Sequence, residues 1–245
     1  MSNEAIILAG GLGTRLRSVI SDLPKCMAPV AGKPFLAYVI NYLQKEGVQK
    51  FIFAVGYKSE SIVDFVNTQH STINVQYSIE EEPLGTGGAI KLACSKATEK
   101  TVLIVNGDTL FNIDVEKFLM FHNMCGADCT LSLKPMHNFD RYGVVELNKD
   151  YSIKSFNEKK FYETGLINGG IYALNKERFL KENLPEKFSF EKEYLEKTLS
   201  LPKSNKKRMY GVVQDKYFID IGIPEDYERA QVELKNPQPL KGSLD

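Results

Sequence analysis

The sequence predicts an α/β fold with a mixed, mostly parallel central sheet and a small antiparallel lobe in its second half. Up to about residue 125, short apolar runs alternate with segments of helical spacing, which is typical of parallel strands covered by helices on both faces. From about residue 126, strand-like runs follow one another with little helix between them, which indicates antiparallel pairing. A chain of 245 residues is enough for one such domain and its core.

The first half supplies the expected parallel strands and the helices that connect them. Strands are predicted at residues 4–8, 50–55, 73–79 and 101–105. Helices are predicted at residues 35–43, before Gly47, around residues 62–66, and at residues 85–95 and 115–123.

The second half supplies the lobe and the C-terminal elements. Strands are predicted at residues 127–134, 143–147, 152–157, 167–174, 209–213 and 217–219, and a helix at residues 190–199. A last helix begins at Pro224, because proline suits the first helical position and the acidic residues Glu225 and Asp226 suit the positive end of the helix dipole. Residues 236–245 contain two prolines and no apolar periodicity, so we expect a domain of residues 1–235 and a mobile tail.

The composition limits the classes of partner. Lys+Arg and Asp+Glu balance at 31 each, so a nucleic-acid partner is not expected. No run approaches the ~18 apolar residues of a membrane span, and the N-terminus lacks the features of a signal peptide.

The four cysteines show no paired framework, so we expect free thiols and a cytoplasmic protein. His122, Cys125 and Cys129 are close in sequence, but a fourth metal ligand is missing, and a helix leading into a strand explains them better.

The strongest motif is a glycine-rich loop after the first predicted strand, Gly10-Gly11-Leu12-Gly13-Thr14-Arg15. Glycines after a strand let backbone N–H groups turn toward an anion, and ligands of open α/β sheets bind at this end of the strands. Leu16 is too large for the third small residue of a dinucleotide-binding fingerprint, and Thr14-Arg15 does not complete a Walker A loop. A phosphate cradle of another kind and a purely structural turn are the two interpretations that remain.

A rigid segment ten residues after Arg15 carries a lysine, Lys25, between Pro24 and Pro29. Fixed cations such as Arg15 and Lys25 neutralise the charge that builds on phosphate oxygens during phosphoryl or nucleotidyl transfer. Taken alone, Lys25 would also fit an ordinary surface lysine.

Together, the loop and Pro24-Lys25 resemble the sugar-1-phosphate nucleotidyltransferase family, whose later motifs follow in order to about residue 234. The resemblance implies a single Rossmann-like nucleotidyltransferase domain, with a nucleotide-binding half at about residues 1–125 and a sugar-binding half at about residues 126–235. It also implies that Arg15 and Lys25 are catalytic. The implied nucleotide contacts in and before the loop are Leu8, Gly10, Gly11, Gly13 and Thr14.

Two aspartates resemble the metal ligands of the family. Asp108 follows the strand at residues 101–105 in the motif Asn106-Gly107-Asp108-Thr109, and Asp220 follows a later strand. The resemblance implies that both bind Mg²⁺ and that Asp108 also contacts the nucleotide, whereas a capping turn would explain Asp108 taken alone. Two carboxylates completed by substrate phosphates and waters suit Mg²⁺. Ile223 stands where the family usually has threonine, a departure that leaves Asp220 untouched.

The segment Glu80-Glu81-Glu82-Pro83-Leu84-Gly85-Thr86 lies between a predicted strand and a predicted helix. Three adjacent acids usually form a solvated loop, but the corresponding family segment holds the base, which implies nucleotide contacts from Glu80, Gly85 and Thr86. A carboxylate accepts from two donors at once, and guanine offers N1–H and N2–H₂ side by side, whereas uracil offers one donor flanked by acceptors. Glu80 therefore favours GTP over UTP.

Three later motifs resemble the sugar site of the family: Gly143 after Arg141-Tyr142, the pair Glu158-Lys159, and Asn168 before two glycines. The resemblance implies that Gly143 and Asn168 touch the sugar, that Glu158 holds sugar hydroxyls and that Lys159 holds the sugar phosphate. Each motif alone would also fit surface charge or a strand bulge.

Within the family, residues 139–143 and 187–191 resemble bacterial D-glycero-D-manno-heptose 1-phosphate guanylyltransferases. This resemblance implies transfer of GMP from GTP to that sugar phosphate, in lipopolysaccharide, capsule or S-layer glycan biosynthesis, with small-molecule substrates as the partners. The sequence does not reveal the oligomeric state, and a monomer and a homodimer both stay open. The alternatives are a uridylyltransferase acting on a hexose or amino-sugar 1-phosphate and a non-catalytic regulatory subunit. A metal-dependent glycosyltransferase would need an Asp-x-Asp motif, which Asn106-Gly107-Asp108 does not supply.

Overall fold

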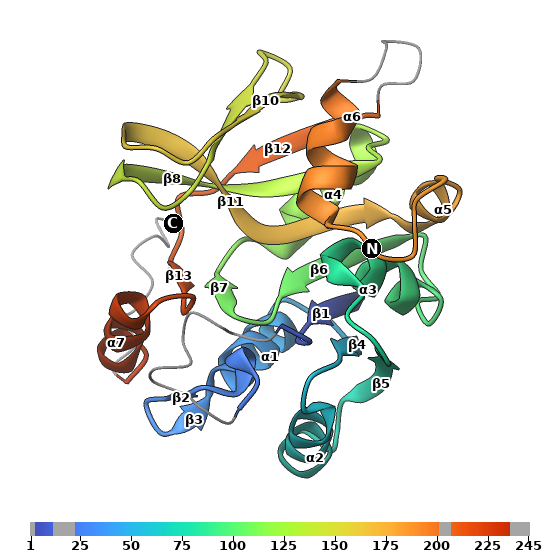
Figure 1. Ribbon diagram of the computed structural model, residues 1–245, viewed down its shortest axis with the longest axis vertical. Coiled ribbons are helices and arrows are strands. Elements are labelled where there is room, and N and C mark those ends of the chain that lie inside the picture. The colour runs from blue at the N-terminus through green and yellow to red at the C-terminus, as the bar shows by residue number, and fades with distance from the viewer. Residues whose placement is uncertain (1–2, 12–22, 201–206, 236–245) are drawn as a thin grey trace.

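The computed structural model describes residues 3–11, 23–200 and 207–235, and its centre is a seven-stranded sheet in the order β12-β8-β11-β6-β1-β4-β5 (Figure 1). The first-half strands pair in parallel: β1 (Glu4–Leu8), β4 (Lys50–Val55), β5 (Asn74–Ile79) and β6 (Thr101–Asn106). In the second half, β11 (Tyr162–Asn175) is antiparallel to β6 and β8 (Cys129–Phe139), and β12 (Met209–Val213) is parallel to β8. The predicted mixed, mostly parallel sheet is confirmed.

Three small antiparallel sheets surround the central one. They pair β9 (Val144–Leu147) with β10 (Ile153–Asn157), β7 (Thr109–Phe111) with β13 (Phe218–Asp220), and β2 (Pro29–Val30) with β3 (Lys33–Pro34). The β9–β10 hairpin, the outer parts of β8 and β11 (residues 134–139 and 162–167) and the turns that join them to the hairpin are called the lobe below. Phe139, Val144 and Ile167 form a small separate core within it. The predicted antiparallel lobe is therefore present.

Helices cover both faces of the central sheet. One face carries α1 (Phe35–Lys45), α2 (Ser59–Gln69), α4 (Val115–Met124) and α7 (Pro224–Glu233), whose buried side chains share one core cluster. The other face carries α3 (Gly85–Cys94), α5 (Lys176–Leu180), the π-helix η3 (Phe190–Glu196) and α6 (Lys197–Leu199). Because successive strand side chains point to opposite faces, Ile7 packs into the first layer and Ile6 into the second.

The predicted helix boundaries are mostly correct. Gly47 follows α1 with a φ of 87°, and α7 begins at Pro224. The predicted helix at residues 190–199 is instead divided into η3 and α6, and π-helical turns are frequently found at functional sites. The short strand β7 and the helix α5 were not predicted, since each is too short to show a periodic pattern.

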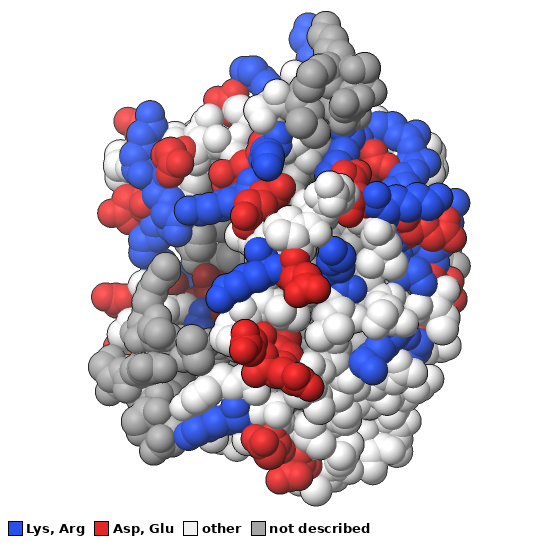
Figure 2. Space-filling view, turned by 45° about the vertical axis from the view of Figure 1, so that its right-hand side comes forward, with Lys and Arg blue, Asp and Glu red and all other residues white. Residues whose placement is uncertain are grey.

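Three further observations concern the surface charges, the cysteines and the length of the helices. Figure 2 shows basic and acidic side chains interspersed over one face of the molecule, in keeping with the balanced composition. The four cysteines are free thiols. None of the helices in the described parts of the chain has the length and apolar character needed to cross a membrane.

Candidate active site

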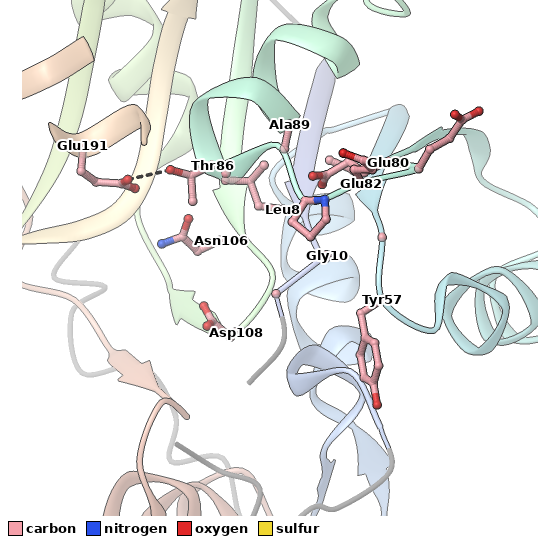
Figure 3. Close-up of a pocket in the computed structure, with 16 residues that line it drawn as sticks. Leu8, Gly10, Tyr57, Glu80, Glu82, Thr86, Ala89, Asn106, Asp108 and Glu191 are labelled. Atoms are coloured by element: carbon pink, nitrogen blue, oxygen red, sulfur yellow. Dashed lines mark hydrogen bonds between the residues drawn. The ribbon is translucent and has the colours of Figure 1, made fainter. Parts of the chain in front are cut away.

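A cavity of about 570 Å³ opens at the carboxyl ends of β1, β4, β5 and β6, which is where open α/β sheets bind their ligands (Figure 3). Seven residues predicted to bind the nucleotide line it: Leu8, Gly10, Gly11, Glu80, Gly85, Thr86 and Asp108. Three further predicted residues, Gly13, Thr14 and Arg15, lie outside the described residues. The part of the glycine-rich loop that the structure describes therefore meets the predicted base segment and the first predicted metal ligand in one cavity.

Glu80 is fixed at one end of the cavity by its position directly after β5. Its backbone N–H donates to the carbonyl of Val55, and its Oε2 accepts from the backbone N–H of Leu84 at 2.9 Å. A side chain at Gly10 would approach Oε1 of Glu80 to 3.0 Å, so the first glycine of the loop leaves room for this carboxylate. Burial raises the pKa of Glu80, and the hydrogen bond from Leu84 opposes that rise.

Asp108 and Asp220 meet because of the pairing between β7 and β13. Asp108 lies in the turn between β6 and β7, and Asp220 lies opposite Thr109 in the β7–β13 ladder. Lys25, in the 3-10 helix η2 (Lys25–Met27), reaches both carboxylates, with Nζ 2.5 Å from Oδ2 of Asp108 and 3.5 Å from Oδ1 of Asp220. Three predicted residues from distant parts of the sequence therefore form one charged cluster.

The charges of this cluster depend on one another. Burial lowers the pKa of Lys25, but the carboxylates of Asp108 and Asp220 outweigh that effect, so the net shift is upward. Burial raises the pKa of Asp220, and the neighbouring charge of Asp108 raises it further. A cation between the two carboxylates therefore stabilises their ionised forms.

The two carboxylates fit the Mg²⁺ that the sequence predicts. The ammonium group of Lys25 lies within reach of both carboxylates, so a single cation can contact the two groups together. Among the described residues there is no group of three or more His, Cys, Asp or Glu side chains arranged to hold a metal. Asp108 and Asp220 would therefore hold Mg²⁺ only together with substrate oxygens and waters, as this ion commonly requires.

The predicted sugar residues do not line the cavity. Glu158 and Lys159 directly follow β10 and are exposed. Asn168 uses its amide internally, because Nδ2 donates to the hydroxyl of Tyr172 at 2.8 Å and Oδ1 accepts from the backbone N–H of Gly170. Gly143 directly precedes β9. The fold alone therefore brings nucleotide residues together in this cavity and leaves the predicted sugar residues outside it.

Glu191 is a cavity residue that the sequence did not predict. It lies at the start of η3, and its Oε2 accepts from the hydroxyls of Thr86, at 2.7 Å, and Ser189 (Figure 3). Asn106, at the end of β6, lines the same side of the cavity. The resemblance of residues 187–191 to a family motif could have identified Glu191 as a site residue. The π-helix that directs its side chain into the cavity has no simple sequence pattern.

The glycines at the start of α3 make room for the segment before η3. Gly87 donates its backbone N–H to the carbonyl of Phe188, and a Cβ at Gly87 would overlap the Phe188 ring. A Cβ at Gly85 would lie 2.6 Å from the Phe188 carbonyl oxygen. Gly85 lines the cavity, and the close backbone approach that it permits is to Phe188 within the protein.

Comparisons with known proteins agree with this geometry. A sequence model of the family described as nucleotidyl transferase matches residues 4–236. The D-glycero-alpha-D-manno-heptose 1-phosphate guanylyltransferase of Aneurinibacillus thermoaerophilus is 52% identical over 233 residues, which cover 95% of this chain and 99% of the relative. The protein of the same name from Campylobacter jejuni is 47% identical over 224 residues, or 91% and 96% of the two chains. The crystal structure of HddC from Yersinia pseudotuberculosis complexed with GMP-PN has a TM-score of 0.84 and 39% identity, covering 95% of this chain and 99% of that one.

Proposed function

This chain belongs to the nucleotidyl transferase family, and we propose that it transfers GMP from GTP to D-glycero-D-manno-heptose 1-phosphate, releasing pyrophosphate. The predicted family is confirmed, as is the resemblance to heptose 1-phosphate guanylyltransferases. The main support for GTP as the nucleotide is the position of the Glu80 carboxylate, which lies in the cavity beside Gly10 of the glycine-rich loop.

Glu80 suits guanine because of its remaining acceptor capacity. One lone pair of Oε2 is taken by the backbone N–H of Leu84, which fixes the orientation of the carboxylate. A carboxylate has about four acceptor positions, so N1–H and N2–H₂ of guanine would find acceptors on this group. Uracil would place a carbonyl oxygen beside the same carboxylate, and the repulsion between acceptors disfavours UTP.

The chemical step would need positioning and charge neutralisation. An oxygen of the sugar phosphate attacks the α-phosphorus of GTP, the bond from that phosphorus to the bridging oxygen breaks, and pyrophosphate leaves with the electron pair. The attacking phosphate is already ionised near neutral pH, so no general base is required. Lys25 would stabilise the negative charge on the phosphates, and Mg²⁺ held by Asp108 and Asp220 would add to that stabilisation. The catalytic role of Arg15 stays a prediction.

A pyrophosphate-release assay tests this proposal. The purified chain with Mg²⁺ is given each of the four nucleoside triphosphates in turn, crossed with the 1-phosphates of D-glycero-D-manno-heptose, mannose, glucose and N-acetylglucosamine. We expect the highest kcat/KM for GTP with the heptose phosphate. A preference for UTP with a hexose or amino-sugar phosphate would instead support the uridylyltransferase alternative, and no release with any pair would support a non-catalytic subunit.

Four further expectations stay predictions. The product of the proposed reaction is an activated heptose, which a glycosyltransferase would use to build lipopolysaccharide, capsule or S-layer glycan. The cytoplasmic location is predicted from the sequence alone, and the choice between a monomer and a homodimer is open. The boundary between a domain of residues 1–235 and a tail of residues 236–245 also has only sequence support.

A further inference from the structure

A buried carboxylate on the C-terminal helix is held by a residue of the lobe. Asp226, in the first turn of α7, is only 5% exposed, and a buried charge is costly unless it is paired. Arg141 Nη1 lies 2.8 Å from Oδ2 of Asp226, and Arg229 Nη2 lies 3.4 Å from Oδ1. Arg229 is three residues away on the same helix, whereas Arg141 comes from the turn between β8 and β9. Of these two ion pairs, only the one with Arg141 joins α7 to the lobe.

The residue after Arg141 reaches the candidate metal site. The hydroxyl of Tyr142 lies 3.5 Å from Oδ2 of Asp220, and its ring packs edge-on against Phe218, two residues before Asp220. The guanidinium of Arg141 lies 5.7 Å from the centre of the Tyr142 ring. Arg141 therefore holds in place the side chain through which the lobe touches the Asp220 carboxylate.

The next residue, Gly143, connects the same turn to the predicted sugar-phosphate residues. A Cβ at Gly143 would lie 2.5 Å from the carbonyl oxygen of Asn157, so only glycine permits this approach. Asn157 ends β10 and is followed directly by Glu158 and Lys159. In Figure 1 the outer ends of β8 and β10 lie on the same side of the molecule as β13 and α7. The turn at residues 141–143 thus links α7, Asp220 and the end of β10.

We propose that the Arg141–Asp226 ion pair is a positioning pair that fixes the lobe relative to Asp220. Arg141 acts through Tyr142 and Gly143, which set where Glu158 and Lys159 stand with respect to the carboxylates and Lys25. This inference rests on the proposed function, because it assigns the lobe to the sugar phosphate. The pair therefore governs the productive placement of the sugar phosphate and leaves nucleotide binding at Glu80 unaffected.

The kinetic test compares two arginines that contact the same carboxylate. Arg141→Met and Arg229→Met are assayed for pyrophosphate release with GTP and D-glycero-D-manno-heptose 1-phosphate. For Arg141→Met we expect the KM of the sugar phosphate to rise about tenfold or more, because a loss of about 1.4 kcal/mol of sugar-phosphate binding corresponds to a tenfold change in affinity. The KM of GTP should stay within about twofold of wild type in both variants. Arg229→Met, which leaves the lobe contact intact, should change neither KM by more than about twofold.

Two further variants separate positioning from general destabilisation. Arg141→Lys keeps a cation for Asp226 but loses the planar fork, so its sugar-phosphate KM should lie between those of wild type and Arg141→Met. If Arg141→Met does not fold, the sugar-phosphate KM of Arg141→Lys is compared with that of Arg229→Met instead. In the double variant Arg141→Met/Asp226→Asn, the KM should be no higher than in Arg141→Met, because the two residues act as one unit. Equal sugar-phosphate KM values for Arg141→Met and Arg229→Met would overturn the proposal.

Hydrogen–deuterium exchange provides a measurement that does not depend on activity. Backbone amides at residues 140–147 and 153–160 should exchange faster in the folded Arg141→Met and Arg141→Lys variants than in Arg229→Met, whereas those of β1 and α3 should not change. Unchanged exchange in the lobe would overturn the positioning role. Absence of pyrophosphate release in the wild type would count against the proposed function alone, since the exchange comparison would still decide whether this ion pair holds the lobe.

Discussion

The nucleotide half and the lobe hold their predicted site residues in different ways. Leu8 ends β1, Glu80 directly follows β5 and Asp108 lies two residues after β6, and all three line one cavity. Glu158 and Lys159 follow a hairpin strand outside the central sheet and are exposed. The parallel strands of the central sheet fix the first group before any ligand binds, whereas the second group relies on the few contacts that hold the lobe.

This difference has a consequence for mutations. Changes in the nucleotide half should act on the chemical step or on the choice of base, because the groups there are already placed. Changes in the lobe should act on the KM of the sugar phosphate. Four substitutions with matched controls test this division, in order of decreasing expected effect.

Asp220→Asn should have the largest effect, because Asp220 is the point where the two regions meet. The substitution keeps the shape of the side chain but removes one of the two charges that converge on Lys25. We expect kcat for pyrophosphate release to fall by about 10²–10³-fold, the usual cost of removing an electrostatic group from a catalytic site. The control is Asp215→Asn, an exposed aspartate paired with Lys134, which should leave kcat unchanged. Near-wild-type turnover in Asp220→Asn would remove this carboxylate from the mechanism.

Lys159→Ala tests the lobe itself. Loss of the predicted phosphate contact should raise the KM of the heptose phosphate by about tenfold, with the KM of GTP unchanged, in line with about 1.4 kcal/mol for one charge-assisted hydrogen bond. Lys160→Ala is a close control, because Lys160 is also exposed and lies 5.3 Å from the Tyr162 ring. If Lys159→Ala and Lys160→Ala have the same KM for the heptose phosphate, a residue other than Lys159 contacts the sugar phosphate.

Glu80→Gln tests the base assignment in the nucleotide half. Glutamine replaces one acceptor oxygen by a donor, so N1–H and N2–H₂ of guanine lose an acceptor while uracil gains a partner. The ratio of kcat/KM for GTP to that for UTP should fall by about tenfold. Glu81→Gln and Glu82→Gln change adjacent acids that also line the cavity and should keep the ratio. An unchanged ratio in Glu80→Gln would contradict the assignment of this residue to the base.

The same contrast explains how much the sequence could predict. The carboxyl ends of buried parallel strands meet at one edge of a sheet, so recognising the strands is enough to place Glu80 and Asp108 together. Asp220 could be placed only through its resemblance to a family motif, because the pairing of β7 with β13 joins segments about a hundred residues apart. Glu191 and the Arg141–Asp226 pair depend on a π-helix and on a tertiary contact, neither of which has a periodic pattern in the sequence.

Thr86→Val tests a hydrogen bond that joins α3 to η3 in the wall of the cavity. The hydroxyl of Thr86, on α3, donates to Glu191 and accepts from the backbone N–H of Phe190, both in η3. Valine keeps the shape but removes both hydrogen bonds. Glu191 still accepts from Ser189, whereas the buried N–H of Phe190 loses its acceptor on Thr86, so the free energy of unfolding in urea should fall by about 1–3 kcal/mol. The hydroxyl of Thr68 bonds only to carbonyls of its own helix, so Thr68→Val is the control and should cost less than about 1 kcal/mol.

The kinetic outcome of Thr86→Val decides which half this residue serves. The sequence predicts a nucleotide contact, and in that case only the KM of GTP should rise. In the structure the hydroxyl is already committed to Glu191 and Phe190, so we expect a different result, in which the two KM values rise together by a few-fold. A rise in both KM values would show that the start of α3 and η3 together support the binding of both substrates. A rise in the KM of GTP alone would support the predicted contact between Thr86 and the nucleotide.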